Sequence, residues 1–555
     1  MRLLLITGTF ALLAGLFNSN RTEAQVLLFN DKVEVTGALT TQASIYTSNA
    51  TVKRLETFSW RIYGNPRVRM KNWDIPMNLV LGSYQDKARQ AFNKFGLSPE
   101  YMDWLTIHLG RRNLNFSPLV LGGKTILGAG FEINPKKFRA GFMWGRFDRA
   151  VAPDSLSFYQ PTYKRTGFAA KLGYGTRSNY VDLVFLHAKD DENSLATLPG
   201  NKKVNPQENS VLGLTVRQRI VKNLYFKFDG AISAYSLDTR VGAPERTDPA
   251  LAKFMSIFLP LRKSNQYLTA IRTSLEYRVM KYTAGIEYER IEPDFKSMGA
   301  WFIRNDIERI TIKGRFSAVK QKLNGNVRIG VQRNNILKDR STRNFQNVNS
   351  LNLNYRHSNA WMFNAIYTNY MTRQTLSLLG FDDSTLLNRR MNNISFSTIY
   401  RNTGKEYGHT GRILVSYQNN KDREQANPLV FNSFNIQLGY RLDILSIDVH
   451  IGPSFTLNRY KFLATTTMRY NPAITVGKSF LEKKMNAYLN MGLSFSRSGG
   501  AAQKFVSRNM LNISYRVLKK HTLSVRLTLT SNQGKVQGLP SYTEFMGDVV
   551  YSISL

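Results

Sequence analysis

The feature that most constrains this chain is a two-residue alternation of apolar and polar side chains. In 523–530, leucine and valine alternate with serine, arginine and threonine, and 224–233 and 545–555 repeat the pattern. Such alternation places successive side chains on opposite faces of a β-strand. Many of these segments have about ten or more residues, which suits a tilted strand crossing a bilayer, whereas soluble strands usually have about 5–6 residues. The pattern therefore predicts membrane-spanning β-strands.

The connections between these segments are asymmetric. Short polar turns are expected at 134–137, 176–179, 221–223, 280–281, 320–322, 357–360, 481–484 and 518–520, and long hydrophilic loops at 190–208, 237–265, 291–305, 372–389, 419–431, 497–504 and 531–541. Outer-membrane barrels have short periplasmic turns and long extracellular loops, and an even number of strands. We expect an all-β chain that forms a single large antiparallel transmembrane β-barrel of about 24 strands, with 22–26 possible.

One stretch, 86–126, does not fit a regular series of hairpins. Within it, 113–125 contains the consecutive apolar residues Leu119, Val120 and Leu121. This segment is interpreted either as a plug that folds inward or as part of an irregular strand.

The N-terminus has the pattern of a secretory signal peptide. Arg2 precedes an apolar stretch over 3–17, and Thr22 and Ala24 occupy the −3 and −1 positions of a cleavage site before Gln25. The alternative is a short membrane anchor, but the apolar stretch is too short to span a bilayer. We expect a signal peptide at 1–24 and a barrel at 25–555. Because the first alternating strand begins near residue 33, the sequence leaves no room for a plug domain or a periplasmic domain before it.

Together these features resemble a Gram-negative outer-membrane β-barrel protein of the porin-like kind. The C-terminal strand carries Tyr551, Ile553 and Leu555 on one face, and is similar to the signal that barrel-assembly machinery reads. Leu555 stands where such strands usually end in an aromatic residue. The resemblance implies an outer-membrane location, contact with membrane lipid and lipopolysaccharide, and recognition by the insertion machinery through the C-terminal strand. It covers nearly the whole chain, but it identifies no specific family and transfers no site residues.

The chain is strongly basic. It has 76 Lys and Arg residues against 38 Asp and Glu residues, a formal charge of +38, and no cysteine. The absence of cysteine excludes a disulfide scaffold, a thiolate metal site and a cysteine nucleophile. A basic excess implies an anionic partner, and an exported protein is not expected to meet nucleic acid.

Alternation allows the charges to be sorted between the two faces of the wall. Lys or Arg facing lipid at mid-bilayer costs about 2–4 kcal/mol, so the charged face is assigned to the lumen. The predicted pore-lining residues are Arg165, Lys171, Arg217, Lys227, Arg272, Arg309, Lys313, Arg315, Arg328, Arg356, Arg412 and Arg526. The same face carries Arg219, Arg278, Arg401, Arg441, Arg469 and Arg516, and the acids Asp182, Asp229, Glu276, Glu287, Glu289, Asp448 and Asp548.

This basic excess on the inner face has two interpretations. Basic residues around a lumen raise the local anion concentration and favour passage of anions. Alternatively, the arginines pair with acids and carbonyls inside a polar barrel, and basic rims bind lipopolysaccharide phosphates.

Aromatic residues are expected at the lipid interface, where amphipathic rings favour the headgroup zone. The predicted belt contains Trp60, Tyr63, Trp73, Trp144, Tyr174, Tyr282, Tyr355, Trp361, Tyr400 and Tyr440. The alternative, a sugar-stacking path inside the lumen, would use Tyr225, Tyr235 and Tyr488, which are too scattered to favour it.

The sequence does not predict an enzyme, a metal site or a cofactor. It has no HExxH and no GxSxG motif. The segment 122–125 resembles the end of a phosphate-binding loop, but Pro118 stands where that motif needs glycine. Asp448 and His450 form the best acid–base pair, and a satisfied interior histidine is the favoured interpretation.

The sequence thus favours a porin-like channel with an anion-favouring lumen. The alternative is a non-conducting or partner-filled barrel that serves as the outer-membrane component of a secretion or surface assembly, because a lumen of about 24 strands leaks unless something fills it. In the loop 237–265, a helix is expected at Pro249–Leu261, ended by Pro260. It could constrict the lumen, cap the mouth, contact a partner or pack on its neighbours.

Overall fold

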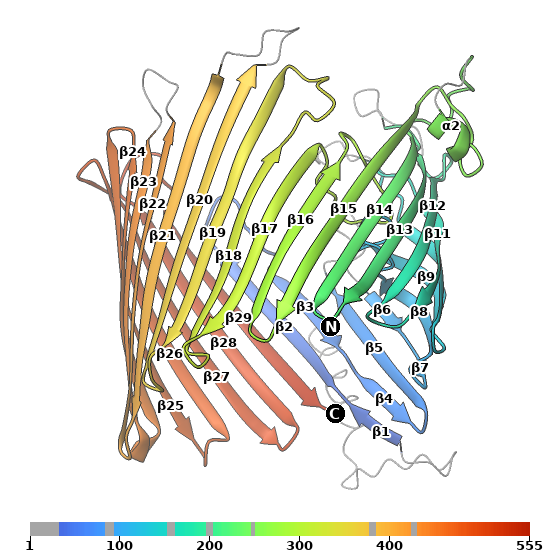
Figure 1. Ribbon diagram of the computed structural model, residues 1–555. Helices are drawn as coiled ribbons and strands as arrows, with labels where there is room; N and C mark the ends of the chain where they lie inside the picture. The colour runs from blue at the N-terminus through green and yellow to red at the C-terminus, as the bar shows by residue number, and fades with distance from the viewer. Residues whose placement is uncertain are drawn as a thin grey trace.

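The computed structural model describes residues 33–83, 94–152, 161–195, 204–245, 250–376, 385–422 and 430–555, which form one closed antiparallel β-barrel (Figure 1). The predicted signal peptide, 1–24, lies outside the described residues. In the described part of the chain, no helix has the length and hydrophobicity needed to cross a bilayer.

The strands follow one another around the wall in chain order, as expected for hairpins of alternating sequence. They are β1 (Val33–Thr36), β2 (Ala38–Ser48), β3 (Phe58–Gly64), β4 (Arg67–Met70), β5 (Trp73–Gly82), β6 (Lys94–Leu97), β7 (Glu100–Tyr101), β8 (Leu105–Asn113), β9 (Thr125–Ile133), β10 (Phe138–Asp148), β11 (Arg165–Gly175), β12 (Tyr180–Asp190), β13 (Glu208–Val221), β14 (Leu224–Ser236), β15 (Asn265–Val279), β16 (Tyr282–Ile291), β17 (Ile307–Ala318), β18 (Leu323–Arg333), β19 (Thr342–Arg356), β20 (Trp361–Leu376), β21 (Thr385–Thr403), β22 (Tyr407–Asp422), β23 (Phe431–Ile444), β24 (Val449–Phe462), β25 (Thr465–Phe480), β26 (Met485–Ser498), β27 (Ala501–Leu518), β28 (His521–Gly534) and β29 (Tyr542–Ser554). The helical elements are α2 (Ala250–Met255) and the single 3-10 turn η2 (Leu445–Ile447).

Three pairs of segments, β1 with β2, β3 with β4, and β6 with β7, are interrupted single strands, so the 29 segments make a 26-stranded barrel. This number is the upper end of the expected range. Between β1 and β2, Gly37 has φ +111°, and a Cβ there would lie 2.4 Å from the carbonyl oxygen of Asn65. Glycine is therefore required at this break. The barrel closes where β2 pairs with β29, from Ala38 opposite Ser554 to Ser48 opposite Glu544.

The expected short turns are all present at one end of the barrel, and most connections at the other end are long. One expected long loop, 497–504, is wrong. β26 and β27 extend through it and leave only Gly499 and Gly500, with φ +56° and +86°. Two consecutive residues with positive φ form a tight hairpin whose twist matches the strands.

The two faces of the wall differ as alternation predicted. The outer face exposes apolar side chains such as Leu172, Leu183 and Ile312, which are about half exposed. The inner face carries the predicted pore-lining charges and, in one sector, a buried apolar cluster.

That cluster exists because two connections from the long-loop end fold inward against β9–β17. We call them the inner ledge: 114–124, which includes the fully buried Leu119, Val120 and Leu121, and 292–306, which includes the fully buried Phe295. Their backbones meet where Gly122 N–H donates to Gly299 O (3.0 Å). The interpretation of 113–125 as an inward segment is therefore correct.

The loop 237–264 folds the other way, onto the outer face of β12–β15, and we call it the outer flap. Its helix α2 ends at Met255, six residues earlier than predicted, and Pro249 lies outside the described residues. Met255 and Leu259 pack on Ala234, whose side chain is on the outer face. Figure 1 shows α2 outside the wall at the long-loop end. The expected apolar helix face is present, and among the alternatives it packs on neighbouring strands.

Candidate functional site

The candidate site is the inner wall of the barrel. The register of the sheet places all twelve predicted pore-lining residues on the inner face, opposite the exposed apolar belt. The period of two fixes this result: one assigned residue per strand determines the direction of every other side chain in that strand. The inner wall divides into two sectors, β9–β17 and β18–β29, and these differ in how many of their basic side chains are paired with acids.

In the sector β9–β17, most inner basic side chains are paired with acids, and Arg315 of β17 is an exception within the described residues. Arg217 contacts Asp229 (2.7 Å), and Lys227 contacts Glu276 (2.9 Å). Arg272 and Arg309 share Glu289, at 2.5 and 2.6 Å. Lys313 pairs with Glu287. Charge pairs of this kind hold neighbouring strands together and leave little net charge for a solute.

Sequence reasoning missed several members of this paired sector. Lys171 contacts Glu132 (2.5 Å), and Arg165 contacts Asp190 (2.8 Å), although neither acid was assigned to the inner face. Arg139 was missed as well, and it contacts Asp182 (2.7 Å). Continuing the alternation of β9, β10 and β12 to their ends would have revealed them.

In the sector β18–β29, most inner arginines of the described residues have no acid partner. Within the described ranges, no carboxylate oxygen lies within 4.0 Å of four predicted pore-lining residues of this sector, Arg328, Arg356, Arg412 and Arg526, or of Arg315 in the adjoining strand β17. The same holds for Arg401, Arg469 and Arg516, whereas Arg441 pairs with Asp443 (2.7 Å). Net positive charge on the inner face is thus concentrated in the C-terminal half of the wall.

A luminal groove of about 640 Å³ lies where the two sectors meet, over β14–β19. One side is lined by the paired Lys227, Glu276 and Lys313, and the other by Arg315 and Arg328. The Arg315 Nε donates to Asn326 Oδ1 (3.1 Å), which leaves its terminal nitrogens available to a solute.

Beyond this groove, the inner wall is rich in neutral hydrogen-bonding groups. Asn364 donates to Asn352 (3.0 Å) and to Asn354 (2.9 Å), and Asn490 donates to Thr475 (2.7 Å). Amides and hydroxyls both donate and accept hydrogen bonds. The unpaired arginines therefore lie in a surface that can solvate an ion without neutralising it.

The inner ledge covers only one side of the lumen. Ser297 Oγ donates to the carbonyl of Val120 (2.5 Å), Met298 N–H donates to Asn209 Oδ1 (3.0 Å), and the Ser233 hydroxyl donates to the carbonyl of Lys296 (2.7 Å). The first bond joins the two loops of the ledge, and the other two fix the ledge to the paired sector. The described part of the chain places no comparable segment over β18–β29.

Two sequence assignments are corrected by the register. Tyr63, expected in the outer aromatic belt, is opposite Thr40 on the inner face, because Trp60 and Ile62 take the outer positions of β3. Asp448 is not in a strand: it ends η2 with φ +50° and contacts Lys483 (3.1 Å), so it does not share a face with His450.

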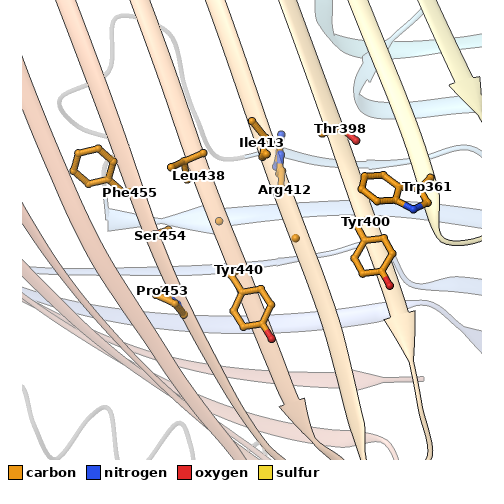
Figure 2. Close-up of a pocket in the computed structure, with 12 residues that line it drawn as sticks. Trp361, Thr398, Tyr400, Arg412, Ile413, Leu438, Tyr440, Pro453, Ser454 and Phe455 are labelled. Atoms are coloured by element: carbon orange, nitrogen blue, oxygen red, sulfur yellow. The ribbon is translucent and has the colours of Figure 1, made fainter.

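The other belt aromatics are on the outer face. At the short-turn end, Trp361, Tyr400 and Tyr440 lie around a shallow hollow of about 440 Å³ over Gly411 (Figure 2). Trp361 and Tyr440 are 39% and 45% exposed. Large exposed rings near strand ends suit a headgroup zone.

No protein-family model and no curated protein matches the sequence. Similar solved structures include the P pilus usher (PapC) translocation pore, at 11% identity and a TM-score of 0.40, covering 94% of this chain and 99% of that chain. Pseudomonas aeruginosa OccK2 (OpdF) in complex with glucuronate matches at 11% identity and a TM-score of 0.30, covering 94% and 98%. The FrpB iron transporter from Neisseria meningitidis matches at 9% identity and a TM-score of 0.37, covering 93% and 82%. The closed 26-stranded wall with its exposed apolar outer face is the architecture of a large transmembrane β-barrel.

Proposed function

We propose that this chain is an outer-membrane channel that favours anionic solutes. The observation that carries the proposal is the set of unpaired inner arginines, above all Arg315 and Arg328, which line the luminal groove, and Arg356, which shares the inner face of β19 with the lining residue Asn352. Unpaired guanidinium groups raise the local concentration of anions and form bidentate bonds with carboxylates and phosphates. The polar wall around them supplies weak contacts that let an ion leave.

The location follows from the same proposal. The signal peptide at 1–24 exports the chain, and the insertion machinery recognises the C-terminal strand β29. The short-turn end then faces the periplasm and the long-loop end faces outward. No catalytic step is needed for this function.

The test is planar-bilayer conductance of the purified barrel, with the reversal potential measured in a salt gradient. We expect a steady, anion-selective conductance that the triple variant Arg315→Gln, Arg328→Gln, Arg356→Gln makes less selective. The matched control removes three charges from the outer face (Arg390→Gln, Arg459→Gln, Arg497→Gln) and should leave selectivity unchanged. Equal effects of both triple variants would contradict the proposal.

A second candidate function is a barrel that holds a partner protein in its lumen, as part of a secretion or surface assembly. The observation that favours it is the width of a 26-stranded wall whose inner ledge covers only one sector. Co-purification of a stoichiometric second protein, together with no conductance from the folded barrel, would support this candidate over the free channel.

A further inference from the structure

The outer face of the wall carries arginines near the long-loop end that no acid neutralises. Arg111 of β8 and Arg146 of β10 are both opposite Leu127 of β9, one on each side. Leu127 is exposed on the outer face, so the two arginines share that face. Within the described residues, neither has an ion pair or a side-chain hydrogen bond.

The same arrangement recurs on the other side of the barrel. Arg459 of β24 and Arg497 of β26 both flank Met468 of β25. Both arginines are exposed, and the described part of the chain offers neither an acid partner. Two independent pairs, each bracketing one apolar residue, point to a shared role.

Each pair has the spacing of a site for one anion. Residues two strands apart are separated by about 10 Å, which two arginine side chains can bridge through a ligand between them. Arg111 and Arg146 carry like charges on the same face, one strand apart from Leu127 on either side, so an anion between them would be attracted by both.

The surface beneath each pair is apolar, so the ligand has an apolar part as well. Under Arg111 and Arg146 lie Leu109 and Trp144, 43% and 59% exposed. Under Arg459 and Arg497 lies Phe495, 41% exposed. A pair of arginines above an exposed apolar surface is complementary to a lipid with a phosphate headgroup, whereas a free ion would use only the arginines.

Basic side chains elsewhere on this face show what a neutralised position looks like. Arg290 lies 3.7 Å from Glu308, and Arg333 also contacts Glu308. Glu308 thus neutralises these two arginines, whereas no acid of the described residues occupies the corresponding position beside the two arginine pairs.

We propose that Arg111 with Arg146, and Arg459 with Arg497, are two binding sites for phosphates of lipid A, the anchor of lipopolysaccharide in the outer leaflet. This inference rests on the outer-membrane location in the proposed function, but not on conduction. Guanidinium groups grip the phosphate, and the acyl chains lie along the apolar belt below.

The experiment is native mass spectrometry of the full-length mature barrel in detergent, titrated with bisphosphorylated lipid A, with dephosphorylated lipid A and with inorganic phosphate. We expect the bisphosphorylated lipid to bind at least about tenfold more tightly than the dephosphorylated one, since hydrogen bonds to charged groups are the strong ones. Arg111→Gln with Arg146→Gln should remove one bound lipid, and Arg459→Gln with Arg497→Gln should remove another.

Two controls accompany these variants. Arg290→Gln, on the same face, and Arg315→Gln with Arg328→Gln, on the inner face, should leave lipid binding unchanged. Arg111→Lys with Arg146→Lys keeps the charge and should retain weaker binding. Heat-dependent gel migration reports folding of each variant.

Equal affinity for the dephosphorylated lipid would overturn the proposal, as would undiminished binding by the folded quadruple glutamine variant. Full competition by inorganic phosphate at equal concentration would also overturn it, because the sites would then bind the ion and not the lipid. Lipid binding in the absence of conductance would leave this inference standing while the channel function failed.

Discussion

The Ser297 hydroxyl donates a hydrogen bond of 2.5 Å to the backbone carbonyl of Val120, and so joins two inward-folded loops that are 177 residues apart in the chain. Next to this bond, Gly299 fits between Leu186 and Val120: a Cβ at Gly299 would lie 2.2 Å from Leu186 Cδ1 and 2.5 Å from the Val120 carbonyl oxygen. The inner ledge therefore depends on a small residue at this position.

Gly299→Val is expected to displace the inner ledge from the wall. Overpacking of this kind costs about 1–3 kcal/mol, which the ledge can relieve by moving while the barrel stays closed. Single-channel recording should show a larger or noisier conductance. Gly439→Ala, where a Cβ meets nothing within 4 Å, is the matched control. Unchanged conductance in a folded Gly299→Val barrel would mean that the ledge does not limit the path.

Glu287→Gln is expected to increase anion selectivity. It frees Lys313 and removes the 3.8 Å contact of Glu287 with Arg309. One charge acting at 4 Å through water contributes about 1 kcal/mol, or roughly a fivefold change in local ion concentration. The reversal potential in a salt gradient measures this change. A shift toward cation selectivity would contradict the assigned pairing.

The outer flap should loosen when Arg262 is removed. Arg262 lies 2.8 Å from Glu208, which is buried beneath the flap and 3.5 Å from His187. Removing one partner of a buried ion pair costs about 3–5 kcal/mol. Arg262→Ala should therefore speed tryptic cleavage at Lys253 in the flap while the barrel remains intact.

The control lies in the same loop. Arg240 pairs with Asp238 at 2.9 Å, but the Arg240 side chain is half exposed, and such a pair contributes about 0–1 kcal/mol. Arg240→Ala should leave the cleavage rate near that of the parent. Equal acceleration by both variants would show that the buried pair does not hold the flap.

The seam between the first and last strands gives a fourth prediction. Asp548 of β29 is 6% exposed and accepts hydrogen bonds from Ser44 (2.6 Å) and Gln42 (3.2 Å) of β2. Asp548→Ala leaves both donors without this acceptor and should destabilise the barrel by about 1–3 kcal/mol. The temperature of heat-dependent gel migration measures the loss. Asp548→Asn keeps an acceptor oxygen and should lose less, and an equal loss in both variants would contradict this account.

The sequence predicted the strands of the wall well, because apolar–polar alternation is a pattern that is complete within each strand. Alternation fixes the direction of a side chain such as Arg526 once one residue of its strand is known to face lipid. It could not show that Arg217 has an acid partner while Arg328 has none, because pairing depends on the register between strands. The sequence did not predict the tight hairpin at Gly499 and Gly500, because the polar residues on either side of it resemble those of a loop.

The inner ledge was only partly predictable. Leu119, Val120 and Leu121 broke the alternation and marked an inward segment, but their partner, around Phe295, is far along the chain and carried no such signal. Likewise, the helix near Met255 was expected, whereas the face of the wall it covers depends on Ala234 being an outward residue small enough to pack against.

Paired charges line one sector of the inner wall, and arginines without acid partners among the described residues line the other. The electrostatic potential therefore differs between the two sides of the lumen. In the proposed channel, an anion between the two sectors meets neutral pairs and the inner ledge on one side, and arginines without an acid partner among the described residues, such as Arg412 and Arg526, on the other. It is therefore drawn laterally before it moves along the axis. Under the proposed function, ions then move along the arginine-lined side of the wall. A wide cross-section is therefore compatible with selectivity, and enlarging the barrel would raise its total conductance more than it would change its selectivity.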